Sequence, residues 1–207
     1  MTEQDEEAAV RTAPPVTIEL LLASPRSRYV GRPADGPEPP PAGPELHESV
    51  EVRAGLGIVG DRYFAKPAHR GASVTLLAAE SLETAARLLG LDRPLDAVAA
   101  RRNVVTRGLD VDSLRGRVIS LDTGDGPVLL RATRPANPCA WMDHVLAAGA
   151  FRALRGLGGM RCEPLTDGVL RLGPAVVELD VESGTESDTV TGASQPVTGA
   201  PGPTGAR

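Results

Sequence analysis

Residues 160–179 read MRCEPLTDGVLRLGPAVVEL. Three short apolar runs lie in this stretch, at 160–165, 169–172 and 175–179, and the pairs Asp167-Gly168 and Gly173-Pro174 separate them. Runs of four to eight residues bounded by Gly, Pro and Asp are typical of β-strands joined by tight turns. The stretch therefore predicts three consecutive strands.

The same pattern continues towards the N-terminus. Turn residues separate further strand-like runs at 16–23, 50–53, 74–77, 103–106, 117–121 and 128–132. Residues 79–89 show helical spacing closed by Gly90, 151–157 predict a second short helix, and 32–44 form a Pro/Gly-rich loop. Many short strands at this spacing, with helices that do not alternate regularly with them, predict a mainly β fold. We expect a β-barrel with a few inserted short helices rather than a doubly wound sheet.

The two ends of the chain differ in composition from its centre. Residues 1–15 are acidic and then Pro-bearing, and 182–207 consist mostly of Ser, Thr, Gly and Pro. Such segments cannot bury enough apolar surface to fold. We predict a disordered lead at 1–15, one folded domain at 16–181 and a disordered tail at 182–207.

Composition excludes several classes of protein. The net charge of −5 over 207 residues argues against general nucleic-acid binding, and no apolar run is long enough to cross a membrane. The acidic N-terminus is unlike a signal peptide. Two cysteines without a CxxC motif do not form a disulfide framework or a structural zinc site. These features together predict a cytoplasmic protein.

Cys139 is the strongest single candidate for chemistry. It follows Asn137, which can cap a helix N-terminus, and Pro138, which suits the first helical position. A cysteine in the first turn of a helix is favoured as a thiolate, which is a nucleophile or a soft-metal ligand. The alternative is a small buried side chain, and that reading is preferred for Cys162, which lies in a strand-like run.

Basic residues gather where predicted strands meet loops. The groups are Arg26 and Arg28, Arg62, His69 and Arg70, and Arg101 and Arg102. Guanidinium groups bind phosphate through paired hydrogen bonds, so convergence on one rim of a barrel would make an anion site. Polar contacts could come from Ser24, Thr75, Asn103 and Asn137. The alternative is that each arginine is an ordinary solvated surface residue.

The run Gly55-Leu56-Gly57-Ile58-Val59-Gly60 matches the dinucleotide-binding pattern G-x-G-x-x-G. That fingerprint requires a helix after the last glycine, and Pro67 stands where the helix would run. The interpretation is instead a tight turn, in which the glycine backbone and Asp61-Arg62 either approach a ligand or merely bend the chain.

These pieces, in this order, resemble the MOSC family, named for the C-terminal domain of molybdenum cofactor sulfurase. The similarity covers roughly residues 16–180 and is greatest to the short, stand-alone bacterial members. The matching stretches are 55–63, 73–82, 101–108, Asn137-Pro138-Cys139, 158–168 and 170–173.

The resemblance implies a β-barrel that binds the molybdenum cofactor, a metal-carrying pterin with a phosphate. Cys139 would be the thiolate ligand to molybdenum, and the region of Arg101 and Asn103 would hold the pterin or phosphate. Other residues implied to line the site are Ser24, Arg26, Arg62 and Thr75. Departures from the family pattern are Ser24-Pro25-Arg26, where some members have Lys-Ser, and Tyr63, where histidine is frequent.

The activity implied by the resemblance is reduction of a small N-hydroxylated substrate, with electrons from partner proteins because no Fe–S or flavin segment is present. Two alternatives stay open. One is a binding or carrier module for the cofactor or another phosphorylated ligand, because no convincing general acid or base is visible. The other is sulfur transfer through a Cys139 persulfide.

Overall fold

A computed structural model of the chain describes residues 15–181, and the segments predicted as disordered lie outside this range apart from Pro15. Seven strands close into a barrel in the order β1-β10-β6-β7-β8-β4-β5. Their bounds are β1 Val16–Leu21, β4 Val74–Ala78, β5 Val104–Arg107, β6 Val118–Asp122, β7 Pro127–Pro135, β8 Met160–Pro164 and β10 Gly173–Leu179. The predicted mainly β barrel is confirmed.

All neighbouring barrel strands among the described residues run antiparallel except β4 and β5, which pair in parallel. A parallel pair needs a crossover connection, and the chain between β4 and β5 supplies it with α1, Ala79–Leu88, and α2, Ala97–Ala100. Strand β5 then pairs antiparallel with β1 and closes the barrel. The crossover places two helices on the outside of β4 and β5.

Side-chain alternation in β4 and β5 divides the core into two parts. Leu76 and Val104 face the barrel interior and belong to its apolar cluster, whereas Leu77 and Val105 face outward under the helices. This follows from the period of two along a strand, and it explains why β4 is buried at every position. Parallel strands covered on both faces read as continuous apolar runs.

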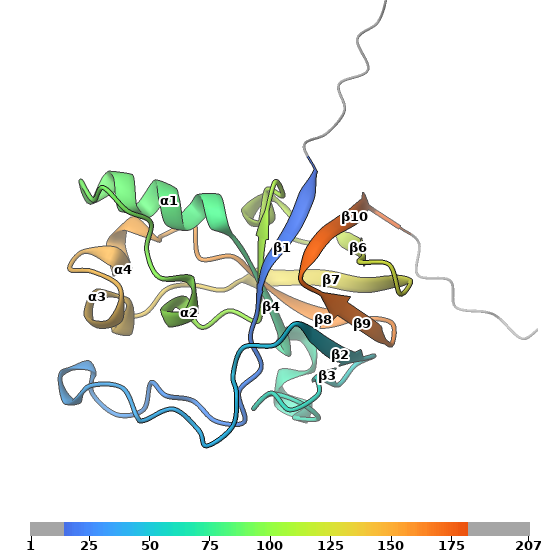
Figure 1. The fold of residues 1–207 in the computed structure, drawn as a ribbon, viewed down its shortest axis with the longest axis horizontal. Coiled ribbons are helices and arrows are strands. Elements are labelled where there is room, and N and C mark those ends of the chain that lie inside the picture. The colour runs from blue at the N-terminus through green and yellow to red at the C-terminus, as the bar shows by residue number, and fades with distance from the viewer. Residues whose placement is uncertain (1–14, 182–207) are drawn as a thin grey trace, which may run out of the picture.

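Two short helices follow β7 and complete the outer layer. They are α3, Trp141–Val145, and α4, Ala150–Ala153, and both contribute to the outer apolar cluster with α1 and α2. Figure 1 shows the four helices on one side of the barrel. On the other side lies a small sheet of order β3-β2-β9, formed by Gly57–Ile58, Ser49–Arg53 and Gly168–Arg171.

The structure corrects the predicted helices in three places. The helix expected at 151–157 ends after Ala153. The helix expected to include Cys139 begins only at Trp141, after Ala140, and no side chain caps it, so the predicted capping role of Asn137 is wrong. Helix α2 was not predicted because four residues show no periodicity; Asp96 caps it through Val98 N, 2.8 Å away.

The G-x-G-x-x-G run forms a tight bend around β3, as the turn interpretation predicts. Gly55, Gly57 and Gly60 have φ values of 65°, 112° and 83°, a region that favours glycine. The bend carries Asp61 to the end of β1, where its buried carboxylate Oδ2 accepts from Ser24 N at 3.2 Å.

Candidate functional site

A buried polar network joins the end of β1 to the starts of β4 and β5. Asn103 Oδ1 accepts from the backbone N–H of Thr75 at 3.0 Å and from its hydroxyl at 2.8 Å. Asn103 Nδ2 donates to Leu22 O at 3.0 Å and to Asp61 Oδ2 at 3.1 Å. All hydrogen-bonding capacity of this amide is taken up by protein. Asn103 and Thr75 therefore position the loops around the site. Direct contact of either residue with a ligand stays a prediction.

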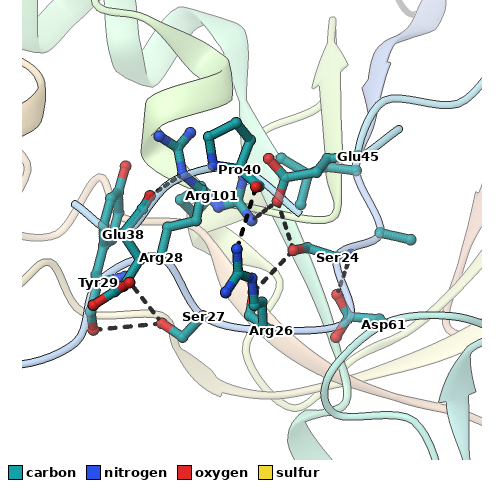
Figure 2. Close-up of polar contacts among 12 residues, drawn as sticks. Ser24, Arg26, Ser27, Arg28, Tyr29, Glu38, Pro40, Glu45, Asp61 and Arg101 are labelled. Atoms are coloured by element: carbon teal, nitrogen blue, oxygen red, sulfur yellow. Dashed lines mark hydrogen bonds and ion pairs between the residues drawn. The ribbon is translucent and has the colours of Figure 1, made fainter. Parts of the chain in front are cut away.

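Ser24, Glu45 and Arg101 form a second group beside this network, shown in Figure 2. Glu45 Oε1 lies 2.6 Å from Ser24 Oγ and 2.6 Å from Arg101 Nη2. Burial acts to raise the pKa of Glu45, but the hydrogen bonds from Arg101 and Ser24 outweigh it, so this pKa lies below its ordinary value. The carboxylate is therefore held ionised against a buried guanidinium.

Arg101 is held in a costly conformation and is only partly satisfied. It ends α2 with φ of 58°, in the left-handed region that few residues other than glycine adopt. Its side chain is only 5% exposed, and its Nη1 is buried with no hydrogen-bond partner among the described residues. An unsatisfied N–H on a buried cation can donate to an acceptor from a ligand.

Arg102 is a second, partly buried cation of the site. Its three guanidinium nitrogens donate to the carbonyl oxygens of Gly158 at 3.0 Å, Ala100 at 3.0 Å and Ala136 at 2.7 Å. Burial and, after it, the positive charge of nearby Arg161 lower the pKa of Arg102 to about 10. Arg101 and Arg117 each have a carboxylate oxygen 2.6 Å from a guanidinium nitrogen. No carboxylate forms such an ion pair with Arg102, which therefore has no direct ion-pair partner within residues 15–181.

Cys139 lies next to this cation. The segment that carries it leaves β7 through Ala136, whose carbonyl binds Arg102, and its own carbonyl accepts from Met142 N at 2.9 Å. The Cys139 thiol is exposed, whereas Cys162 is fully buried in the barrel. Burial raises the pKa of Cys162 to about 12, so that thiol stays protonated at neutral pH, as expected for a packing residue. Only Cys139 is available for chemistry.

Aromatic side chains line the site on the side of the four helices. The rings of Tyr29 and Trp141 stack with centroids 5.1 Å apart, and the edge of His144 lies against Trp141 at 6.2 Å. Tyr29 and His144 also line a cavity of ≈ 300 Å³ together with Arg101. Cys139 is near enough to both Tyr29 and Arg102 to influence the pKa of each.

The structure brings Arg62 to the site but gives Arg26 and Arg70 other roles. Arg62 N donates to Ser24 O at 2.7 Å, and its Nε is buried with no hydrogen-bond partner in the described part of the chain. Exposed Arg26 instead bonds the carbonyls of Pro39 and Pro40 at 3.0 and 3.2 Å (Figure 2), which fastens the long loop. Arg70 is 70% exposed and pairs with Glu163 at 3.3 Å.

Asn137 is exposed, and no side-chain hydrogen bond from it is seen within residues 15–181. Sequence reasoning noticed Arg102 only as one of a pair and gave no role to Tyr29 or Glu45. The run Arg101-Arg102-Asn103 before a strand was a usable signal for Arg102. Glu45 had none, because it follows a Pro-rich loop with no pattern of its own.

Residues 15–181 contain no group of three or more His, Cys, Asp or Glu side chains placed to hold a metal ion. None of the helices in this range is long and apolar enough to pass through a bilayer.

We define the candidate site as exposed Cys139, the aromatic pair Tyr29 and Trp141, and the arginine cluster Arg62, Arg101 and Arg102.

Comparison with known proteins identifies related folds. The model of the MOSC domain matches residues 65–177, more than half of the chain. The crystal structure of the YuaD protein from Bacillus subtilis superposes with a TM-score of 0.61 at 18% identity, covering 80% of this chain and 95% of YuaD. That of YiiM from Geobacillus stearothermophilus gives 0.52 at 17% identity, covering 83% and 78%. No curated protein sequence matches this chain.

Proposed function

Because this chain belongs to the MOSC domain family, we propose that it binds a molybdenum cofactor and reduces small N-hydroxylated compounds. The observation that supports the proposal is one exposed thiol in the same site as two buried guanidinium nitrogens, Arg101 Nη1 and Arg62 Nε, that have no hydrogen-bond partner among the described residues. A thiolate suits a soft metal, and arginines suit a phosphate.

The residues present fit such a group. The buried nitrogens Arg101 Nη1 and Arg62 Nε have no hydrogen-bond acceptor among the described residues. Arg102 forms no ion pair there, so its positive charge favours a bound anion. Phosphate oxygens would satisfy all three. One protein thiolate is a sufficient ligand set only when the metal arrives with other ligands, as it does on a pterin dithiolene.

Each residue would then have a separate task. Cys139 would bind the metal, Arg101 and Arg62 the phosphate, and Arg102 would hold the Cys139 segment through Ala136 and balance negative charge. The stacked rings of Tyr29 and Trp141 would flank planar groups. When bound, the cofactor supplies the two-electron redox chemistry, and the protein supplies position and electrostatics.

The test is metal and pterin analysis of protein expressed in a host that makes the cofactor. We expect about one molybdenum per chain in the wild type and a loss of most of it in Cys139→Ala. Cys162→Ala, which removes the other thiol, is the matched control and should keep the metal. Equal molybdenum in wild type and Cys139→Ala would remove Cys139 from its role.

A second variant tests the anion side of the site. Arg102→Met removes the positive charge that forms no ion pair within residues 15–181, and since charge-assisted hydrogen bonds contribute about 1.5–3 kcal/mol each, cofactor content should fall about tenfold or more. Arg115→Met, at an exposed turn, removes the same charge elsewhere and should have no effect. Unchanged phosphate and pterin content in Arg102→Met would contradict the assignment.

One observation favours a carrier without turnover. The Tyr29 hydroxyl donates to Ala99 O at 2.5 Å, and burial raises the pKa of Tyr29. The hydroxyl therefore stays protonated at neutral pH with its proton held by a carbonyl, which makes it a poor proton donor to a substrate. A loaded protein that reduces a hydroxylamine with an artificial electron donor would exclude the carrier. A persulfide on Cys139 after incubation with a sulfur donor, seen by mass spectrometry of metal-free protein, would favour sulfur transfer instead.

A further inference from the structure

A groove whose lining is partly apolar and partly basic lies between α1 and α4 and includes no residue of the candidate site. Its volume is ≈ 430 Å³, and Leu88, Leu89 and Leu157 line it together with Arg152 and Arg155. Leu88 is 69% exposed. A hollow that combines an exposed leucine with charged side chains has the mixed composition of a protein-binding surface.

The groove is positively charged in a protein whose net charge is −5. Arg152 and Arg155 are exposed, and neither forms an ion pair with an acidic side chain of the described residues. Arg155 instead lies over the ring of Phe151 at 5.1 Å. By contrast, Arg53 and Arg171 at the opposite side of the barrel pair with Asp167 and Asp125. The two groove arginines are thus available to carboxylates from another molecule.

The combination points to a protein partner rather than a nucleic acid. The overall negative charge of the chain disfavours nucleic acid, and the leucines offer no stacking surface for bases. A protein interface typically has an apolar centre with charged residues around it. The complementary surface is therefore an apolar patch surrounded by Asp and Glu, because opposite charges steer and orient association.

The groove is built from the same segments that hold Cys139. Leu157 is followed by Gly158, whose carbonyl accepts from Arg102 Nε at 3.0 Å and whose Cα lies against Ala136. On the other side, Phe151 N of α4 donates to Asp143 Oδ1 of α3 at 2.6 Å, and α3 begins just after Cys139. A partner bound in the groove would therefore contact the segments that position Cys139.

The proposed reaction needs a partner that delivers electrons. Reduction of R–NHOH to R–NH2 and water consumes two electrons and two protons. Two cysteines cannot hold an iron–sulfur cluster, which takes four thiolates, so the chain has no cluster of its own to store them. We propose that the groove lined by Leu88, Arg152 and Arg155 binds the acidic face of an electron-carrier protein. This inference rests on the proposed function.

A binding experiment tests the groove without any need for activity. The probe is a flavodoxin, a small acidic flavoprotein, titrated calorimetrically at low ionic strength; cytochrome c, a basic carrier, serves as the comparison. We expect flavodoxin to bind and cytochrome c not to bind. The double variant Arg152→Gln/Arg155→Gln should bind flavodoxin about tenfold more weakly, and added salt should remove the difference.

Matched controls separate the groove from charge in general. Arg53→Gln/Arg171→Gln removes the same charge from β2 and β9, which lie across the molecule in Figure 1, and should bind as wild type. Leu88→Ser should weaken binding, whereas Val176→Ser, at a residue 67% exposed on β10, should not. Equal effects of both arginine pairs, no binding to wild type, or binding of an oligonucleotide in place of flavodoxin would overturn the proposal.

Turnover distinguishes this proposal from the one on which it rests. In the loaded protein, reduction driven by methyl viologen, a small dye that needs no docking, should be equal in wild type and Arg152→Gln/Arg155→Gln. Reduction driven by flavodoxin should fall about tenfold in the variant. No reduction with viologen would contradict the reductase function, whereas equal flavodoxin rates in the two proteins would contradict only the groove.

Discussion

Asn103 Nδ2 lies 3.1 Å from Asp61 Oδ2, so one buried hydrogen bond joins the start of β5 to the bend after β3, which are 42 positions apart. The same carboxylate oxygen accepts from Ser24 N, and the amide also binds Thr75 and Leu22. Three loops that carry site residues are therefore held by two adjacent side chains.

Asn103→Ala should destabilise the fold strongly. The change removes the donor to Asp61 and the acceptor for Thr75 N, and leaves both buried without those partners. We expect a loss of about 3 kcal/mol in the free energy of unfolding, measured by urea denaturation. Asn137→Ala, at an exposed amide, should stay within about 0.5 kcal/mol of wild type. Equal effects would show that the buried network has no energetic role.

The ion pair of Glu45 with Arg101 predicts a pH dependence of stability. The pKa of Glu45 is below its ordinary value of 4.5 in the folded protein, so its contribution is present above that pH and is lost as the pH falls through the folded-state pKa. Glu45→Gln should be less stable than wild type by about 2 kcal/mol at pH 7, because it leaves Arg101 without a counter-charge.

Below pH 4.5 the difference between wild type and Glu45→Gln should shrink. Denaturation curves from pH 7 to pH 3 measure it. Glu38→Gln, in the same loop at an exposed residue, should show no such convergence. A difference between wild type and Glu45→Gln that is constant with pH would contradict the pairing.

Gly158 tests the position of the Cys139 segment. A Cβ at this residue would lie 2.4 Å from Ala136 O, so Gly158→Ala must push the two segments apart. We expect a loss of about 2 kcal/mol or more in stability and a lower molybdenum content. Gly43→Ala, where nothing lies within 4 Å of the added carbon, is the control and should be neutral or slightly stabilising. Native-like stability of Gly158→Ala would contradict the close contact.

The two cysteines should differ in reactivity because one is exposed and the other is buried. Iodoacetamide should add one alkyl group to the metal-free native protein, on Cys139, and two groups in denaturant. Peptide mass spectrometry identifies the modified residue. Modification of Cys162 in the native protein at a similar rate would show that the barrel interior opens readily.

The barrel was predictable because its signal is local and repeated. Runs such as 169–172 and 175–179 lie between Gly and Pro turns, and each became a strand within one or two residues of its expected bounds. Closure by the parallel pair β4 and β5 was not predicted, since no local pattern distinguishes a parallel neighbour. The helix start near Cys139 was misplaced because Ala136 and Pro138 pack against Gly158, a contact that the sequence does not reveal.

Site residues were predictable by type more than by role. Cysteine is rare in this chain and is noticed at once, whereas arginine is abundant and stands out only where it lies beside turns. The roles of Arg62, Arg101 and Cys139 stay predictions. Arg26 and Arg70 look the same in sequence, yet one binds Pro39 and Pro40 carbonyls and the other pairs with Glu163. Only the folded chain shows which guanidinium groups already have partners.

The most direct measurement is X-ray absorption at the molybdenum edge of loaded wild type and of Cys139→Ser, whose hydroxyl can still approach the metal. The account predicts one sulfur neighbour fewer around molybdenum in the variant. The same number of sulfur neighbours in both proteins, at equal metal content, would contradict it.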